Sequence, residues 1–218
     1  MSLSIIRTAD KSPTLYVSEL DEHYHSTFGA LTESRHVYVD CGLLHRAKDS
    51  QEDTLKVFEV GFGTGLNAAL TAMTGQKVSY AAIEKYPLNR EITDKLDFSP
   101  CVDRSVLVKI HEAPWNEPVR LSENFTIHKI ESDFLSYIPA GTYDVIFMDA
   151  FAPDKQPEMW TPQVISKIAS MLSPRGVVTT YCAKGDVRRA FQACGLIVER
   201  LPGPEEGKRE ILRATKMQ

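Results

Sequence analysis

Three acidic residues lie at or near the carboxyl ends of three successive predicted strands. Glu59 precedes a glycine-rich turn, Glu84 ends the run VSYAAIE, and Asp133 follows FTIHKIES. Open α/β sheets bind ligands at this edge, and an acid about 20 residues past a glycine-rich turn can accept hydrogen bonds from both ribose hydroxyls of an adenosine. Asp133 alone could equally be a solvated turn residue. Together, the three acids predict a site for an adenosine-containing ligand.

The glycine-rich turn EVGFGTGLN, residues 59–67, joins the first of these strands to a predicted helix. Glycines here let the backbone approach a ligand and present the N–H groups of the helix N-terminus. A dinucleotide fingerprint has the spacing G-x-G-x-x-G, whereas the third glycine, Gly65, comes one residue early and Leu66 takes its place. The spacing weakens NAD binding and resembles motif I of the S-adenosylmethionine-dependent methyltransferases. A tight turn that binds no ligand is the alternative.

A fourth acid, Asp149, follows the apolar run YDVIFM and begins the pattern D-x-F-A-P-x-K-x-P-x-M-W. Generic methyltransferases share the glycine turn but not this pattern. Together with GFGTGLN, EKYPL at 84–88, GKREILRA at 207–214 and ESRHVYVDCGLLHR at 33–46, it closely resembles the methyltransferase domain of the bacterial tRNA-modifying enzymes that complete 5-methylaminomethyl-uridine at the wobble position. The resemblance covers most of the chain.

The resemblance implies a Rossmann-like class I methyltransferase fold, α/β with a mostly parallel sheet, and S-adenosylmethionine as cofactor. The implied reaction is N-methylation of 5-aminomethyl(-2-thio)uridine in the anticodon loop of tRNA. Some bacteria fuse this domain to an FAD-dependent oxidoreductase; we expect a stand-alone form, whose aminomethyl substrate a separate enzyme supplies. The residues expected to bind the cofactor are Glu59, Gly61, Phe62, Gly63, Gly65, Asn67, Glu84, Asp133, Phe134, Tyr24 and Glu33.

Methyl transfer to a primary amine is an in-line displacement that requires nitrogen, carbon and sulfur to be collinear. A free amine with a pKa of about 10 is mostly protonated at neutral pH, and a carboxylate with a pKa of about 4 is a weak base. We therefore expect Asp149 to accept a hydrogen bond from the amine, aim its lone pair and stabilise the developing cation. Phe151 is expected to wall the site or stack on the uracil. The alternatives are a turn acid and a core aromatic residue.

Contacts with tRNA require cations, and an unpaired wobble uridine can be splayed out and stacked on an aromatic side chain. We expect Trp160 to anchor its loop in the core rather than to contact RNA. A charged helix face that is only solvated is the alternative for the cations. The residues proposed to face tRNA are Lys155, Lys184, Arg188, Arg189, Lys208 and Arg209.

Two other functions fit the same residues. A methyltransferase of this fold could act on a small-molecule amine or on another RNA, and a protein that kept only the fold could bind tRNA without catalysis. The net charge of −4 argues against a protein that coats nucleic acid nonspecifically.

The composition, 43% apolar and 25% charged, is that of an ordinary globular protein. No apolar stretch approaches the length of a membrane span and the first residues lack a secretory pattern, so we expect a cytoplasmic protein that binds no membrane. His23 and His25 have no third ligand at suitable spacing, and the four cysteines form no CxxC pair. We therefore expect no metal.

The pattern of strands and helices positions these side chains. From about residue 55 strands and helices alternate, which predicts a parallel sheet with helices on both faces. Thr161 is expected to cap a helix that begins at Pro162. LIVERLP and REILRATK predict an antiparallel pair near the C-terminus. We divide the chain into residues 1–54, an extension with strand-like TLYV and HVYVD packed over one sheet edge, and residues 55–218, the methyltransferase domain.

Overall fold

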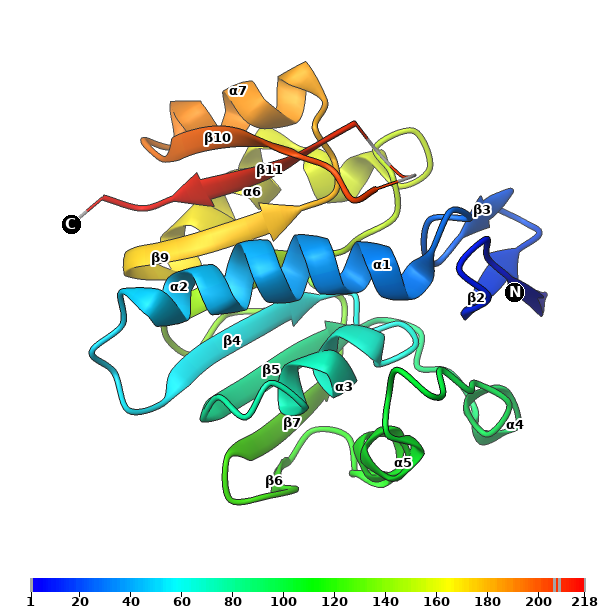
Figure 1. Ribbon diagram of the computed structural model, residues 1–218. Coiled ribbons are helices and arrows are strands. Elements are labelled where there is room, and N and C mark those ends of the chain that lie inside the picture. The colour runs from blue at the N-terminus through cyan, green and yellow to red at the C-terminus, as the bar shows by residue number, and fades with distance from the viewer. Residues whose placement is uncertain (1, 206, 208, 218) are drawn as a thin grey trace.

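A mixed β-sheet forms the centre of the computed structural model, which describes residues 2–205, 207 and 209–217 (Figure 1). Over these residues the sheet has eight strands in the order β10-β11-β9-β8-β4-β5-β7-β6. The neighbours from β9 to β7 are parallel, as predicted, and β6 at the edge is antiparallel to β7. The strands are β4 (Leu55–Val60), β5 (Val78–Glu84), β6 (Pro118–Arg120), β7 (Phe125–Glu131), β8 (Tyr143–Met148), β9 (Leu172–Thr180), β10 (Ile197–Pro202) and β11 (Glu210–Thr215).

The predicted antiparallel pair near the C-terminus is confirmed. β11 inserts between β9 and β10 and is antiparallel to both. Because the inserted strand is reversed, β10 at the sheet edge runs in the same direction as β9. This edge lies at the top of Figure 1, far from β6.

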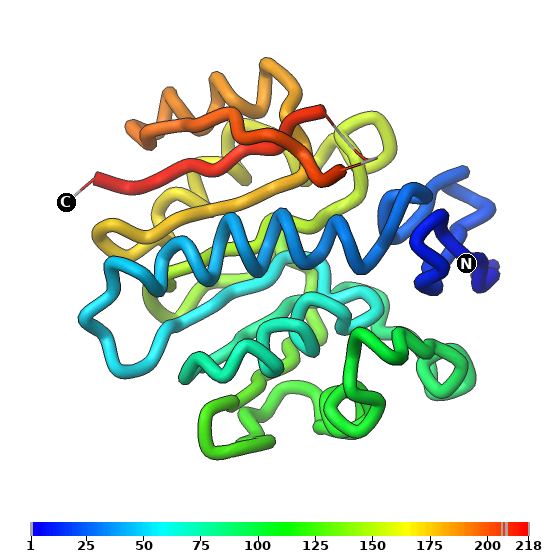
Figure 2. Tube along the Cα trace, in the orientation of Figure 1, coloured from blue at the N-terminus to red at the C-terminus, as the bar shows by residue number. Residues whose placement is uncertain are grey.

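Helices cover both faces of the sheet (Figures 1 and 2). On one face, η1 contacts β8, β9, β11 and α3, and α3 contacts α5. Residues of α6 and α7 pack with a second core cluster on the other face. The helical elements are α1 (Ala30–Ser34), the π-helical η1 (Arg35–Leu44), α2 (His45–Lys48), α3 (Leu66–Ala72), α4 (Arg90–Thr93), α5 (Arg104–Glu112), the 3-10 helix η2 (Pro157–Trp160), α6 (Pro162–Met171) and α7 (Gly185–Ala193). In the described part of the chain no helix is long and apolar enough to cross a membrane.

The N-terminal segment corrects part of the sequence prediction. TLYV lies in β2 (Pro13–Val17), which forms a small sheet with β1 (Leu3–Arg7) and β3 (Glu22–His23). HVYVD is not a strand but part of η1, and it packs across a face of the large sheet rather than over its edge. The physical reason is that Val37, Tyr38 and Val39 are all buried, between the sheet and α3, whereas a half-buried strand would bury every second residue. The division of the chain at residues 54 and 55 stays a prediction.

Local signals for helix ends agree with the structure. Thr161 caps α6 by accepting a hydrogen bond from the N–H of Val164, and Pro162 occupies the first helical position. Gly195 follows α7 with a φ of 79°. The long insertion before β7 contains α5 and β6, which the sequence pattern did not predict.

Candidate active site

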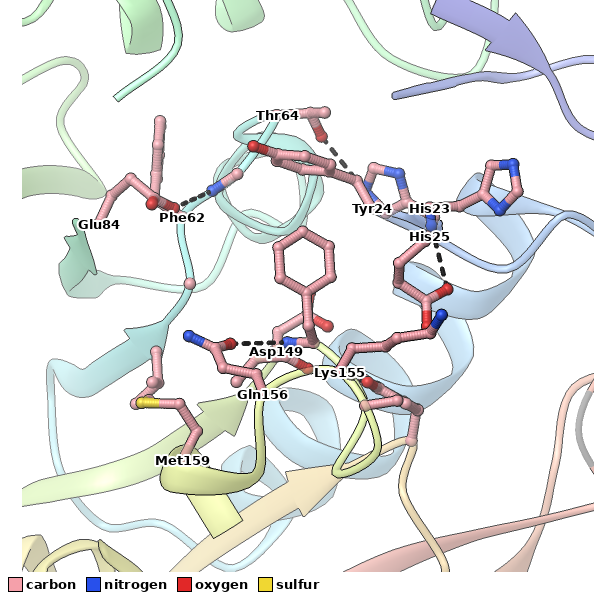
Figure 3. A pocket seen from close by; sticks show the side chains of 18 of the residues that line it. His23, Tyr24, His25, Phe62, Thr64, Glu84, Asp149, Lys155, Gln156 and Met159 are labelled. Atoms are coloured by element: carbon pink, nitrogen blue, oxygen red, sulfur yellow. Dashed lines mark hydrogen bonds between the residues drawn. The ribbon is translucent and has the colours of Figure 1, made fainter. Parts of the chain in front are cut away.

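A cavity of about 650 Å³ opens at the carboxyl ends of β4, β5, β7 and β8 (Figure 3). Its walls include the glycine turn and two segments far apart in the chain, residues 20–28 (the N-terminal wall) and residues 149–160 (the Phe151 loop). The volume lies within the range of about 300–1,000 Å³ that is usual for small-molecule sites. The predicted sheet edge therefore does carry a ligand-sized cavity.

The glycine turn reaches the cavity because two of its residues adopt backbone conformations that favour glycine. Gly61 has a φ of 90°, and a Cβ atom there would lie 2.5 Å from the carbonyl oxygen of Asp149. Gly63 has a φ of 51° and lies under the Tyr24 ring, with a hypothetical Cβ 3.1 Å from its Cδ1. Larger residues at these two positions would have a strained backbone and would press on Asp149 and Tyr24.

Glu84 and Asp133 both line the cavity at the ends of β5 and β7. Glu84 accepts hydrogen bonds from the N–H groups of Gly63 (3.1 Å) and Tyr86 (2.9 Å), so its carboxylate is held beside the glycine turn (Figure 3). The Lys85 ammonium lies 2.9 Å from Asp133, and this contact lowers the pKa of the Asp133 carboxyl. Two carboxyl side chains thus line the cavity after neighbouring strands.

Asp149 directly follows β8 and is held at both carboxylate oxygens. The hydroxyl of Tyr38 donates to Oδ1 at 2.6 Å, and Nδ2 of Asn67 donates to Oδ2 at 2.8 Å. The same Asn67 nitrogen donates to Oε1 of Glu59 at 2.8 Å, and the Tyr80 hydroxyl donates to Oε2 at 2.8 Å. Burial raises the pKa of Glu59 well above its usual range, and the nearby Asp149 charge acts in the same direction.

Two side chains hold the Phe151 loop through hydrogen bonds to the Phe151 backbone. The N–H of Phe151 donates to Oε1 of Gln156 at 3.2 Å, and the indole N–H of Trp160 donates to the Phe151 carbonyl at 2.7 Å. Trp160 is buried, so the structure places it as the predicted anchor of the loop. The Phe151 ring meets the Tyr24 ring edge to face at 5.3 Å, with both side chains on the cavity wall.

The N-terminal wall is joined to the glycine turn by His25. Its Nδ1 and Nε2 pair with the hydroxyls of Thr14 (3.0 Å) and Thr64 (3.2 Å), and burial lowers its pKa to about 4. Glu33 also lines the cavity and accepts a hydrogen bond from the N–H of Ser26 at 2.8 Å. Among the described residues, no cluster of three His, Cys, Asp or Glu side chains is arranged to hold a metal.

The cations proposed to face tRNA are not all at the cavity. Lys155 lines it, whereas Lys184 pairs with Asp154 of the Phe151 loop. Arg188 and Arg189 lie on α7, and Arg189 pairs with Asp186 of the same helix. Arg209 is exposed just before β11, and Lys208 lies outside the described residues.

Most residues predicted for the cofactor line this single cavity, but Glu59 and Gly65 do not. Glu59 is wholly buried below it, so its part in binding is indirect, through Asn67. The Phe62 ring packs against Trp115 at 5.6 Å and is buried as well. Sequence reasoning missed Tyr38 and Tyr80, because no local pattern shows which tyrosine reaches an acid far along the chain.

Known proteins resemble this chain in sequence. A family model described as "S-adenosyl-L-methionine-dependent methyltransferase" matches residues 111–217. The chain is 33% identical over 215 residues to the "tRNA 5-methylaminomethyl-2-thiouridine biosynthesis bifunctional protein MnmC" of Pseudomonas savastanoi pv. phaseolicola, and 31% identical to the protein of that name from Pseudomonas syringae pv. syringae. Both alignments cover 90% of this chain and 32% of the relative, so the chain spans about a third of the length of these relatives.

Solved structures share the fold. MNMC2 from Aquifex aeolicus matches with a TM-score of 0.82 and 24% identity, covering 100% of this chain and 71% of that chain. The magnesium protoporphyrin IX methyltransferase ChlM from Synechocystis PCC 6803, solved with bound SAM, matches with a TM-score of 0.55 and 15% identity over 86% of this chain and 81% of that one. The fold class predicted from the sequence is confirmed.

The family model and the sequence relatives agree with the chemistry predicted from the motifs. They support the methyltransferase class and S-adenosylmethionine as its cofactor. The resemblance stated from the sequence is therefore confirmed: the chain is similar in sequence to the MnmC proteins over about a third of their length, and it has the class I S-adenosylmethionine-dependent methyltransferase fold.

Proposed function

We propose that this chain transfers a methyl group from S-adenosylmethionine to the primary amine of 5-aminomethyl(-2-thio)uridine at the wobble position of tRNA. The observation that carries the proposal is the position of Asp149, a carboxylate held at both oxygens in the same cavity as the glycine turn and Glu84. The printed names of the MnmC relatives support the tRNA substrate.

The residues of the cavity suit S-adenosylmethionine. Gly61 and Gly63 line the cavity with backbone alone, Glu84 offers acceptors for ribose hydroxyls, and Asp133 offers one for the adenine amino group. When bound, the cofactor would supply a methyl group activated by a sulfonium. The chain itself has to bring a neutral amine into line with that methyl group.

Asp149 performs this alignment by accepting a hydrogen bond from the amine. A lone pair is then directed at the methyl group, and the carboxylate stabilises the positive charge that develops on nitrogen. Tyr38 and Asn67 each donate to one oxygen of the carboxylate, which lines the cavity that the amine would enter. Phe151 and Tyr24 form an aromatic wall that shields the amine from water and offers a surface for the uracil ring.

A direct assay tests the proposal. The purified chain is incubated with S-adenosylmethionine and anticodon stem-loops that carry 5-aminomethyl-2-thiouridine, 5-aminomethyluridine or unmodified uridine, and with free alkylamines. Nucleoside mass spectrometry should detect a gain of one methyl group on the two aminomethyl nucleosides alone.

Other outcomes separate the alternatives. More efficient methylation of the free amines than of the stem-loops would indicate a small-molecule methyltransferase. Stem-loop binding without methylation of any nucleoside would indicate a tRNA-binding protein that lacks catalysis. In cells that lack the chain, unmethylated aminomethyl nucleoside should accumulate in tRNA.

The proposal also covers the source of the amine substrate and the location of the reaction in the cell. The amine has to be formed on the uridine before methyl transfer, so another enzymatic activity must act first on the same tRNA. We propose that a separate enzyme supplies this substrate and that both act in the cytoplasm. Fractionation of cells that express the tagged chain, with the unmethylated tRNA traced in each fraction, tests the location.

A further inference from the structure

We propose that Tyr38 and Asn67 are positioning residues for methyl transfer, which hold the Asp149 carboxylate in the orientation that receives the amine. The inference rests on the proposed function and deepens it. Tyr38 comes from η1 and Asn67 from α3, so two elements other than β8, which Asp149 follows, would control the geometry of its carboxylate.

The first support is that the Asp149 carboxylate has to be kept from rotating. The terminal torsion of an aspartate side chain has broad minima, so a carboxylate at a cavity wall rotates easily unless its oxygens are bound. At Asp149 the Tyr38 hydroxyl donates to one oxygen at 2.6 Å and the Asn67 amide donates to the other at 2.8 Å, and rotation of the carboxylate would break both hydrogen bonds. Catalytic groups have to be held within about 0.5 Å of the productive position.

The second support is that both donors are themselves immobile. Tyr38 is 1% exposed, and its ring packs against Phe147 at 5.2 Å. Asn67 is 3% exposed, and its second hydrogen bond goes to Glu59, which Tyr80 fixes in turn. Asp149 is therefore connected to the rigid centre of the sheet through both oxygens.

The third support is the charge of the Glu59–Asp149 pair, whose members share Asn67 as donor. Two carboxylates in contact with one amide resist double ionisation, because like charges favour the neutral form of one of them. Glu59 is the deeper of the two, and burial raises its pKa. The Asp149 carboxylate lines the cavity, where the amine becomes cationic.

The fourth support is the backbone of η1. This segment is π-helical over Arg35–Leu44, and it packs on β8 and α3. π-helical turns are rare and occur frequently at functional sites, since the wider turn changes where a side chain points. Tyr38 lies within this π-helical segment, and its hydroxyl donates to Asp149.

The test compares Tyr38→Phe with Tyr143→Phe. Both variants delete one hydroxyl and keep the ring, but Tyr143 lies at the start of β8 and packs on Phe58, away from the cavity. We expect Tyr38→Phe to lower kcat by about 10- to 100-fold, the scale caused by misplacement of a reacting group, while the Kd for S-adenosylmethionine changes less than about 2-fold. Tyr143→Phe should keep the kcat of the wild type.

A double-mutant cycle identifies Asp149 as the group through which Tyr38 acts. In the Asp149→Ala background, Tyr38→Phe should lower kcat by less than about 2-fold, because the carboxylate that it orients is absent. Asn67→Ala should show the same dependence on Asp149. Equal losses in both backgrounds, or an unchanged kcat in Tyr38→Phe, would overturn the proposal, and so would a Kd that rises as much as kcat falls.

A failure of the proposed function gives a different result. In that case the wild type itself methylates no aminomethyl stem-loop, whatever its cofactor affinity. Crystal structures of the wild type and of Tyr38→Phe then decide the positioning role directly: a rotated Asp149 carboxylate in the variant supports it, and an unchanged one contradicts it.

Discussion

Gly61 lies directly against the backbone of Asp149. A Cβ atom added to Gly61 would stand 2.5 Å from the Asp149 carbonyl oxygen, closer than real Cβ atoms come. The two segments are also joined by a hydrogen bond, because the N–H of Asp149 donates to the carbonyl of Val60, the neighbour of Gly61, at 3.0 Å. The glycine turn and the residue that follows β8 are thus in direct backbone contact.

Gly61→Ala should therefore damage both stability and cofactor binding. The residue combines a positive φ with a clash against backbone, so we expect a loss of about 3 kcal/mol or more in the free energy of unfolding. Gly75→Ala is the matched control, since Gly75 has a φ of 76° with nothing within 4 Å of its Cβ. It should cost only about 1 kcal/mol, and urea unfolding with calorimetric binding of S-adenosylmethionine compares the two. Equal losses would show that the contact with Asp149 is unimportant.

Asp149→Ala should lose methyl transfer while it keeps the cofactor. Removal of a preorganised polar group that stabilises developing charge costs about 100-fold in kcat or more. Because Glu84 and the glycine turn are unchanged, the Kd for S-adenosylmethionine should stay near that of the wild type. Single-turnover methylation and calorimetry measure the two quantities separately. Undiminished methylation in this variant would remove Asp149 from the reaction.

Glu84→Ala should have the opposite profile. The loss of a charged acceptor for the ribose hydroxyls should raise the Kd for S-adenosylmethionine by about 10-fold or more, with kcat at saturating cofactor little changed. Glu131→Ala is the control, because Glu131 lies beside Glu84 in the register of β5 and β7 but is exposed and outside the cavity lining. An unaltered Kd in Glu84→Ala would exclude the ribose role.

Stability should fall as the pH drops from about 6.5 toward 4, in part through His25. Its pKa is lowered to about 4 in the folded chain, so the unfolded chain binds a proton in this window and the folded chain does not. The full shift corresponds to about 3 kcal/mol, and the partial exposure of the residue reduces it to on the order of 2 kcal/mol.

Urea unfolding of the wild type and of His25→Gln at pH 7 and pH 5 tests this prediction. The variant should be less stable at pH 7, because Thr14 and Thr64 lose their shared partner. Its stability should then decline less between the two pH values than that of the wild type. Parallel declines would mean that His25 is not titrating in this window.

Lys155→Ala should weaken the interaction with RNA alone. Lys155 lines the cavity on the Phe151 loop, where an ammonium can contact a phosphate of the anticodon loop. We expect the KM for the stem-loop to rise about 3- to 10-fold at low salt, with a smaller effect at high salt and no change in cofactor Kd. Lys48→Ala, at the end of α2, is the control and should leave KM unchanged. Equal effects of the two variants would exclude a specific contact at Lys155.

Local patterns were sufficient where the signal lies within one strand–turn–helix unit. The run from β4 through the glycine turn to α3, and the acids Glu84 and Asp133 after their strands, follow from sequence spacing because parallel strands end at one sheet edge. The cap at Thr161 and the reversed strand near the C-terminus follow from neighbouring residues in the same way.

Local patterns failed where burial depends on contacts with distant segments. HVYVD alternates like a strand, yet η1 is helical because it packs between the sheet and α3, which the local sequence does not contain. Lys184 and Arg189 form ion pairs with Asp154 and Asp186, and their contact with tRNA stays a prediction. A list of cations does not show which of them already have acidic neighbours.

The amino-acid sequence by itself determined the fold class, the cofactor edge and the acid that ends β8, because each depends on short-range spacing. Only the tertiary structure decided how that acid is held. Tyr38 and Asp149 lie 111 positions apart, and their hydrogen bond exists because η1 crosses the face of the sheet at β8. A contact over that separation is set by the packing of the whole core, which no local pattern encodes.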